Sequence, residues 1–243
     1  MTKATPLLEV RDLCVAVGDK PVLNSISLKV APGELHVLLG PNGSGKSSLL
    51  AAIMGLPPWR ITSGTILLDG TPIDEMSLFE RAQLGIGMAF QRPPSLEGVS
   101  LNSFAKSIDA HSDLDQAAER LNLTAFLQRD LNVGFSGGEI KRWEVLKLIL
   151  QDPHLALFDE PESGVDLEHV KAIGTAIQQF MARPDKTGRQ RAGLVITHTG
   201  LILAHVDASH AHILQSGELV HSGPPTELFQ HVQSHGYSVP LAS

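Results

Sequence analysis

The fold of this 243-residue chain is decided by its residues 40–47, Gly40-Pro41-Asn42-Gly43-Ser44-Gly45-Lys46-Ser47, followed by Ser48. They match the pattern GxxxxGK[ST] at every fixed position, which predicts a loop whose backbone N–H groups surround phosphate oxygens. The glycines leave room for those amides, and a helix starting here adds partial positive charge. Lys46 should bridge the β- and γ-phosphates of a nucleotide, and the Ser47 hydroxyl should ligate Mg²⁺.

The residues around this loop predict an α/β fold. His36–Leu39 before it is a short, fully apolar strand, typical of the interior of a parallel sheet. Lys46–Met54 after it predicts a helix that Gly55 stops. Alternation of strands and helices over the second half of the chain favours a mostly parallel sheet. In this half we expect helices at Ser136–Leu150 and Leu167–Met181 and strands at Leu155–Phe158 and Leu194–Thr197.

Three other regions complete the organisation of the chain. In the first ninety residues we expect edge strands at Leu7–Val10 and Leu13–Val17 and a strand pair at Thr65–Leu68 and Gly85–Phe90. Residues 92–131 lose strand signals and predict a small helical insertion, with apolar residues at Leu114, Ala117, Ala118, Leu121 and Leu123. The tail predicts a strand pair that turns at Ser216-Gly217 and a short helix after Pro225.

Composition excludes several classes of protein. The net charge of −7 argues against binding to nucleic acid, and no apolar run reaches the ~18 residues that membrane insertion requires. Glu9 and Asp12 occupy the place of a signal peptide's apolar stretch. The single cysteine, Cys14, excludes an intramolecular disulfide and is expected in the core. These features predict a soluble, cytoplasmic protein.

Two further segments place charged and polar groups beside the phosphate loop. Leu155–Glu160, LALFDE, is an apolar strand ending in two carboxylates, and ligands of open α/β sheets bind at the carboxyl ends of strands. Asp159 should face the Mg²⁺ region, and Glu160 should polarise a water in line with the γ-phosphate. His198 follows the next strand and reaches the same edge, where it could contact the γ-phosphate.

A second anion site is predicted at residues 135–144, FSGGEIKRWE. Ser136 and Glu139 have the spacing of a capping box, so a helix should begin there. An ordinary capped helix does not explain Gly137 and Gly138, each of which costs roughly 1 kcal/mol relative to alanine. Their exposed amides at a helix N-terminus suit a phosphate.

Together these motifs resemble, in order and spacing, an ATP-binding cassette (ABC) ATPase. The resemblance implies one domain over residues 7–243, with a RecA-like core and an antiparallel β subdomain in residues 7–91 and 136–243 and a helical subdomain at about 92–135. It implies that Gln91 senses Mg²⁺ and the attacking water and that Asp166, in Ser163-Gly164-Val165-Asp166, couples two sites. It also implies a transient head-to-tail homodimer, in which Ser136, Gly137 and Gly138 close over ATP and Mg²⁺ held by the other copy.

Finer details resemble the SufC subfamily, ATPases of iron–sulfur cluster assembly. They are MAFQRPP at Met88–Pro94, NVGFSGGEIKRWEVL at Asn132–Leu146, and HGYS at residues 235–238. The resemblance implies soluble SufB- or SufD-like scaffold partners that dock on the helical insertion and the loop after Gln91. Two features depart from it: Pro161 follows Glu160, as in transport ATPases, and the helical insertion is short. A transporter ATPase subunit is the alternative, because both classes have the same motifs at the nucleotide site. A regulatory module without hydrolysis is disfavoured by Glu160 and His198.

Four remaining signals are assigned structural explanations. Many ATPases of the family that this sequence resembles stack adenine on an aromatic residue early in the chain. Residues 15–19 contain no aromatic residue, which predicts modest nucleotide affinity and loose base selectivity. His210 and His212 share one strand face, but no acidic or thiol residues join them at compact spacing, so we expect a solvated surface. Residues 183–191 should form an exposed loop, and Trp143 should pack rather than recognise a ligand.

Overall fold

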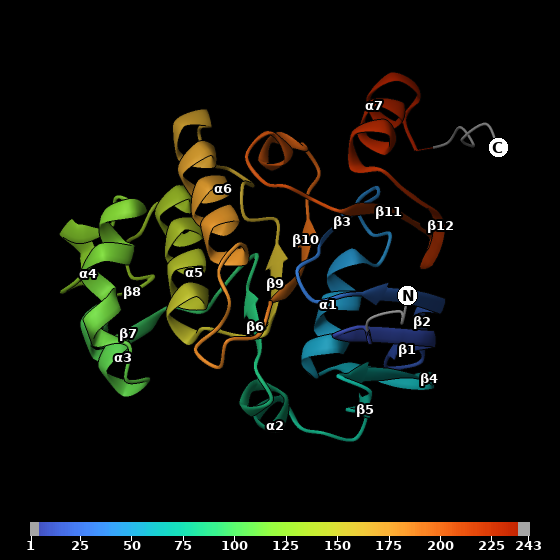
Figure 1. Ribbon diagram of the computed structural model, residues 1–243, viewed down its shortest axis with the longest axis horizontal. Coiled ribbons are helices and arrows are strands. Elements are labelled where there is room, and N and C mark those ends of the chain that lie inside the picture. Colours follow the sequence, from blue (N-terminus) through green and yellow to red (C-terminus); the bar gives the residue numbers. More distant parts are fainter. Residues whose placement is uncertain (1–4, 238–243) are drawn as a thin grey trace.

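A computed structural model describes residues 5–237 and contains a six-stranded sheet in the order β12-β11-β3-β10-β9-β6 (Figure 1). Every neighbouring pair is parallel except β11 with β12. This confirms the α/β fold and the mostly parallel sheet. The bounds are β3 Leu35–Leu39, β6 Ile86–Ala89, β9 Leu155–Asp159, β10 Ala192–Ile196, β11 His210–Gln215 and β12 Glu218–Gly223.

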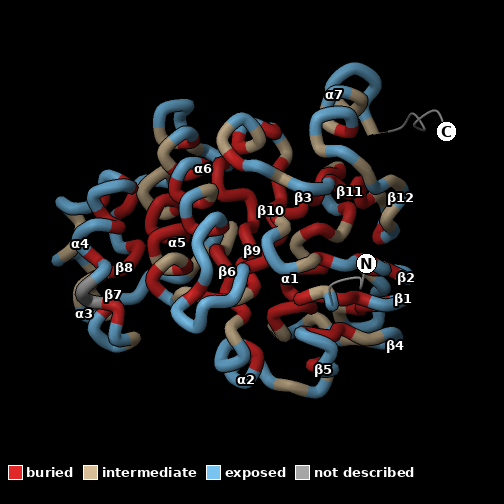
Figure 2. The backbone as a smooth tube through the Cα atoms, viewed as in Figure 1, coloured by how far each residue is buried: buried red, intermediate tan, exposed pale blue. Residues whose placement is uncertain are grey.

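Helices cover both faces of this sheet and divide the apolar interior into two cores. Val37 and Leu39 of β3 pack with α5 (Gly137–Gln151) and α6 (Leu167–Met181) on one face. Leu38 faces the other way, toward α1 (Lys46–Met54) and the amino-terminal strands. Because successive side chains of a strand point to opposite faces, one fully buried strand contributes residues to both cores. Figure 2 shows the buried segments in the centre of the molecule.

The amino-terminal strands form a separate antiparallel sheet in the order β2-β1-β4-β5. The predicted edge strands are wrong, because they form one bulged inner strand, β1 (Leu8–Val17), between β2 (Lys20–Val30) and β4 (Trp59–Leu68). The predicted pairing of Thr65–Leu68 with Gly85–Phe90 is also wrong, since β4 pairs with β1 and β6 pairs with β9. Local pattern identifies strands but not their partners. The last strand, β5, spans Thr71–Pro72.

The middle of the chain forms the predicted helices beside α5 (Figure 1). They are α3 (Leu101–Ser107) and α4 (His111–Arg120), followed by a 3₁₀ turn at Thr124–Phe126. The apolar residues singled out in the sequence are all buried. The expected absence of strands is wrong, because β7 (Leu96–Ser100) pairs with β8 (Asp130–Leu131). β7 is largely exposed and lacks the apolar pattern of a buried strand.

The other elements are α2 (Leu78–Gln83), a 3₁₀ turn at Leu201–Ala204 and α7 (Pro225–His235). The tail predictions are confirmed by the β11–β12 pair and α7. Among the described residues, no helix is long and apolar enough to cross a membrane.

Three single-residue expectations have mixed outcomes. Trp143 is buried, with its ring edge-on to Phe104 at 5.3 Å, which confirms packing. Cys14 is only half-buried, and its sulfur accepts a hydrogen bond from the Ser25 amide. The loop at 183–191 is not wholly exposed: Arg191 is buried and paired with Asp152. Arg191 can be buried because its charge is paired with that of Asp152. The polar composition of residues 183–191 alone does not reveal this pairing.

Candidate functional site

The loop between β3 and α1 has a backbone that only glycine allows at two positions. Gly40 has φ of 152°, and a Cβ there would lie 2.1 Å from the carbonyl oxygen of Leu214. Gly45 has φ of 107°, and a Cβ there would meet the Leu23 side chain at 2.7 Å. The loop therefore passes against neighbouring strands while keeping its amides free of side chains.

The Lys46 ammonium lies inside this loop. Its Nζ donates to the carbonyl oxygens of Gly40 at 2.8 Å and Pro41 at 2.9 Å, and the residue is buried. Burial lowers the pKa of Lys46, while the nearby carboxylates of Glu160 and Asp159 oppose that shift. A cation held at the first turn of α1 adds to the positive potential that favours phosphate.

A cavity of about 1050 Å³ opens over the loop. It gathers most of the residues that the sequence analysis named, from four separate elements of the sheet edge. Ser44 is a buried residue of the loop, and Asp159 contacts Ser47. The predicted residues that line the cavity are Gly40, Pro41, Asn42, Gly43, Gly45, Lys46, Ser47, Ser48, Gln91, Glu160 and His198.

The chemistry of Ser47 and Asp159 suits Mg²⁺. Ser47 Oγ donates to Asp159 Oδ1 at 3.0 Å, so a hydroxyl and a carboxylate oxygen meet beside the loop. Hard oxygen donors of this kind are the ligands that Mg²⁺ prefers. Burial raises the pKa of Asp159, and the hydrogen bond from Ser47 partly offsets this. A cation beside the carboxylate would compensate its desolvation.

Glu160 is held between two side chains. Gln91 Nε2 donates to Glu160 Oε2 at 2.6 Å, and His198 Nε2 contacts Oε1. Glu160 has φ of 51°, a left-handed conformation that costs energy for a residue with a side chain and is common at functional sites. A buried carboxylate fixed at both oxygens and facing the cavity can accept a proton from a water.

Residues of the second predicted anion site lie elsewhere. Ser136 caps α5 by accepting from the Glu139 amide at 3.3 Å, and Asp166 caps α6 by accepting from the His169 amide at 3.0 Å. Ser136 and Gly137 are exposed. Within the described part of the chain, none of Ser136, Gly137, Gly138 and Asp166 lines the cavity over the phosphate loop.

Two residues of the site were missed by sequence reasoning. Tyr237 lines the cavity beside Val22, and burial raises the pKa of its phenol, an effect that the Gly40 backbone opposes. It comes from the HGYS segment, of which residue 238 lies outside the described residues. Glu162 is buried and accepts from Thr197 and Thr199 next to Glu160. No local pattern assigns either residue a role at the nucleotide site, because both reach it through tertiary packing.

An aromatic ring thus reaches the cavity although residues 15–19 have none. Modest nucleotide affinity stays a prediction.

The solvated-surface interpretation of the tail histidines is wrong for His212. This residue is buried, and its Nε2 lies 2.9 Å from Nδ1 of His36. An acidic residue, Glu34, does join this group.

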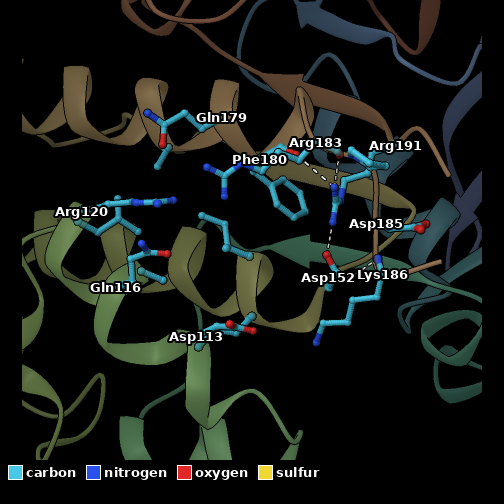
Figure 3. Close-up of a pocket in the computed structure, with 16 residues that line it drawn as sticks. Asp113, Gln116, Arg120, Asp152, Gln179, Phe180, Arg183, Asp185, Lys186 and Arg191 are labelled. Carbon is cyan, nitrogen blue, oxygen red and sulfur yellow. Dashed lines mark hydrogen bonds and ion pairs between the residues drawn. The ribbon is translucent and has the colours of Figure 1, made fainter. Parts of the chain in front are cut away.

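A second cavity, of about 300 Å³, lies between α4, α5 and α6 and contains no residue of the phosphate loop (Figure 3). Arg120 and Gln179 lie around it, and the Arg191–Asp152 pair closes one side. It has none of the residues that the motifs predict, so the chemistry belongs to the first cavity.

Comparison with known proteins agrees with this geometry. The family model described as ABC transporter matches residues 23–163. The chain is 34% identical to "Probable ATP-dependent transporter ycf16" of Trieres chinensis (96% of each chain covered) and 34% identical to "Probable ATP-dependent transporter SufC" of Escherichia coli (95% of this chain, 97% of the relative). It is 36% identical to "Vegetative protein 296" of Bacillus subtilis (96% and 93% covered).

Solved structures share the fold. A nucleotide-free ATP-binding cassette from an ABC transporter superposes with a TM-score of 0.76 at 22% identity, covering 94% of this chain and 95% of the other. A cassette in its ADP conformation gives 0.77 at 22% identity, with 95% of both chains covered. The family match spans more than half of the chain, and the relatives span nearly all of it. This chain therefore belongs to the ABC transporter family, as a SufC-type ATPase.

Proposed function

We propose that this chain is the ATP-hydrolysing subunit of a cytoplasmic iron–sulfur cluster assembly complex, and that it works as a head-to-tail dimer. The observation that carries the dimer is the separation of two anion-binding elements. The phosphate loop lines the cavity, while Ser136 and Gly137 are exposed at a helix N-terminus outside it. A helix N-terminus with free amides binds phosphate well, so a second copy can supply the missing half.

In the proposed reaction, each residue acts where the fold places it. The loop amides and Lys46 bind the β- and γ-phosphates of ATP. Ser47, Asp159 and Gln91 would hold Mg²⁺, which would neutralise negative charge that develops on the phosphates. Glu160 accepts a proton from the attacking water.

His198 is proposed to contact the γ-phosphate and to keep Glu160 oriented. Ser136, Gly137 and Gly138 of the second copy complete the shell of hydrogen-bond donors around that phosphate. Asp166, which caps α6 at an exposed position, is proposed to contact the second copy and couple the two sites. Neither copy alone completes the γ-phosphate shell, so hydrolysis should depend on association.

The proposed partners are soluble SufB- or SufD-like scaffold subunits. With Cys14 as its only cysteine, this chain lacks a set of thiolates to hold a cluster, so the partners must supply them. The helical subdomain and the segment after Gln91 are the proposed docking surface. Support comes from two exposed apolar side chains: Leu96 on β7, within the segment after Gln91, at 44%, and Phe79 on α2, the helix that precedes β6, at 68%.

Two measurements test the proposal. Glu160→Gln, mixed with Mg-ATP, should abolish turnover but accumulate a dimer in light scattering, and adding Ser136→Ala should shift it back to monomer. A monomeric preparation that hydrolyses ATP at full rate with Ser136 replaced would contradict the dimer. Affinity purification of the chain from its native host should recover soluble scaffold subunits. Recovery of membrane permeases alone would favour the transporter alternative.

A further inference from the structure

Four polar side chains meet at the amino ends of β3 and β11, the sheet edge opposite the phosphate loop. Glu34 directly precedes β3, and His36 is its second residue. β3 and β11 are neighbours in the sheet (Figure 1). They run parallel, with His36 in register with His210. His212 is two residues further along β11 and points to the same face as His210.

The donor atoms of Glu34, His36 and His210 all lie within 4.8 Å of one another. The three groups differ in burial, with His36 at 2% exposed, Glu34 intermediate and His210 exposed. The carboxylate is fixed in place, because Glu34 Oε2 accepts from the Ala31 amide at 2.8 Å and lies 3.0 Å from His36 Nε2. The cluster is thus anchored on its inner side and open on its outer side.

We propose that Glu34, His36 and His210 form a binding site for a divalent first-row transition metal of the Zn²⁺ type. Two imidazoles and one carboxylate are a ligand set for such ions, whereas Mg²⁺ prefers oxygen alone. Bonds of about 2.0–2.2 Å to a tetrahedral ion bring donor atoms to roughly 3.4 Å apart. Rotation of the exposed His210 side chain closes the remaining distance without moving the sheet. A fourth position faces solvent.

A second row of hydrogen bonds orients the inner ligand. His36 Nδ1 lies 2.9 Å from His212 Nε2, and His212 Nδ1 lies 2.7 Å from Ser222 Oγ. Metal on His36 Nε2 requires its proton on Nδ1, which is then donated to His212 Nε2. His212 in turn donates from Nδ1 to Ser222. In this series of hydrogen bonds, His36 donates to His212 and His212 donates to Ser222. Ligating histidines are commonly held by hydrogen bonds of this kind.

The site is distant from the nucleotide cavity. Since β3 is five residues long, the site lies about 16 Å from the phosphate loop. It is separate from the proposed Mg²⁺ site.

The test uses full-length, tag-free protein without nucleotide, in buffer with excess Mg²⁺. Isothermal titration with Zn²⁺ should give one site per chain, and Co²⁺ should show visible d–d absorption of low-symmetry coordination. His210→Asn and Glu34→Gln should each weaken Zn²⁺ binding at least 100-fold and remove the Co²⁺ spectrum, while His221→Ala should change neither. His212→Gln should weaken binding by about 10- to 100-fold through the outer row.

Circular dichroism checks that each variant is folded, and His210→Asn is informative because the side chain is exposed. Wild-type protein without a Zn²⁺ site would overturn the proposal. Binding unchanged in His210→Asn and Glu34→Gln would do the same. Binding lost in His235→Ala but kept in these variants would place the ion on α7 instead, where His231 and His235 stack at 4.9 Å.

Discussion

Ser136→Ala should impair ATP hydrolysis far more than it destabilises the fold, and the chain contains its own control. Two helices begin with a capping box, α5 at Ser136/Glu139 and α2 at Ser77/Glu80. The serine oxygens accept from the glutamate amides at 3.3 Å and 3.4 Å, respectively. The glutamates accept from the serine amides at 2.7 Å and 2.8 Å. As caps, the two serines are equivalent.

Their hydroxyl protons differ. Ser77 Oγ donates to Glu80 Oε2 at 2.7 Å, which uses its proton within the box. Ser136 Oγ acts only as an acceptor within the described part of the chain, so its proton is available to an anion. The structure thus separates the capping role, common to both serines, from donation to phosphate, open only to Ser136.

The magnitudes follow from these contacts. Loss of a serine cap costs about 1 kcal/mol, within a range of roughly 0.5–2, and lowers Tm by about 2–4 °C in a chain of this size. Both Ser136→Ala and Ser77→Ala should show this change by circular dichroism. A hydrogen bond to a charged group contributes about 1.5–3 kcal/mol, so Ser136→Ala should also lower kcat/KM for Mg-ATP by roughly 10- to 150-fold.

The assay measures phosphate release at protein concentrations that allow dimers, alongside thermal unfolding of each variant. Ser77→Ala should keep kcat/KM within twofold of wild type. Equal losses of activity in both variants would show that cap stability alone explains the effect. Unchanged activity in Ser136→Ala would refute the role of this serine at the phosphate.

Three further changes probe the cavity and the fold. Tyr237→Leu should weaken ATP binding by about 1–3 kcal/mol, because the ring can stack on the base at the cavity. Titration of wild type and variant with ATP, and with GTP for comparison, measures this, and equal ATP affinity of the two proteins would exclude stacking. Arg81→Met should lower the free energy of unfolding in urea by about 3 kcal/mol or more, because buried Arg81 donates to four carbonyl oxygens, two of them at the end of α1. Arg81→Lys should be similarly destabilised, because an ammonium group cannot reach all four oxygens as the guanidinium does. Asp185→Asn should destabilise by about 1–3 kcal/mol at pH 7. Burial acts to raise the pKa of Asp185, but hydrogen bonds from Thr187 and the Arg189 amide outweigh it and hold the pKa below its ordinary 3.8. The difference in the free energy of unfolding between wild type and variant should therefore shrink as the pH falls below 3.8 and disappear once acid protonates the wild-type carboxylate. A difference at pH 2 that equals the one at pH 7 would contradict this.

The elements next to chemical signals could be predicted to the residue. α1 runs over Lys46–Met54 as expected, because the phosphate loop sets its start and Gly55 adopts the left-handed conformation that ends it. α6 runs over Leu167–Met181 because Asp166 caps it and its apolar stripe faces the core. In both helices the decisive interactions are local, so their signals lie within a few residues of each other.

The parts that could not be predicted depend on contacts between distant residues. β4 pairs with β1 and not with β6, since strand partners are chosen by packing that period-two patterns do not encode. Tyr237 reaches the phosphate loop from the other end of the chain. Glu34 and His36 meet the tail histidines only because β3 and β11 are neighbours. Sequence reasoning therefore identified the motifs at the cavity and missed the groups that tertiary packing adds.

The helix that carries Ser136 is bonded to the catalytic strands of its own chain. Glu144 of α5 is buried and accepts from the Phe90 amide at 2.8 Å, directly before Gln91. Lys141 of the same helix is also buried and donates to the Asp159 carbonyl oxygen at 3.3 Å. Leaving such a buried group without its partner costs about 1–3 kcal/mol, so α5 cannot shift freely against these strands. A displacement of the whole helix must either break these bonds or move the backbone at Phe90 and Asp159, the residues directly before Gln91 and Glu160.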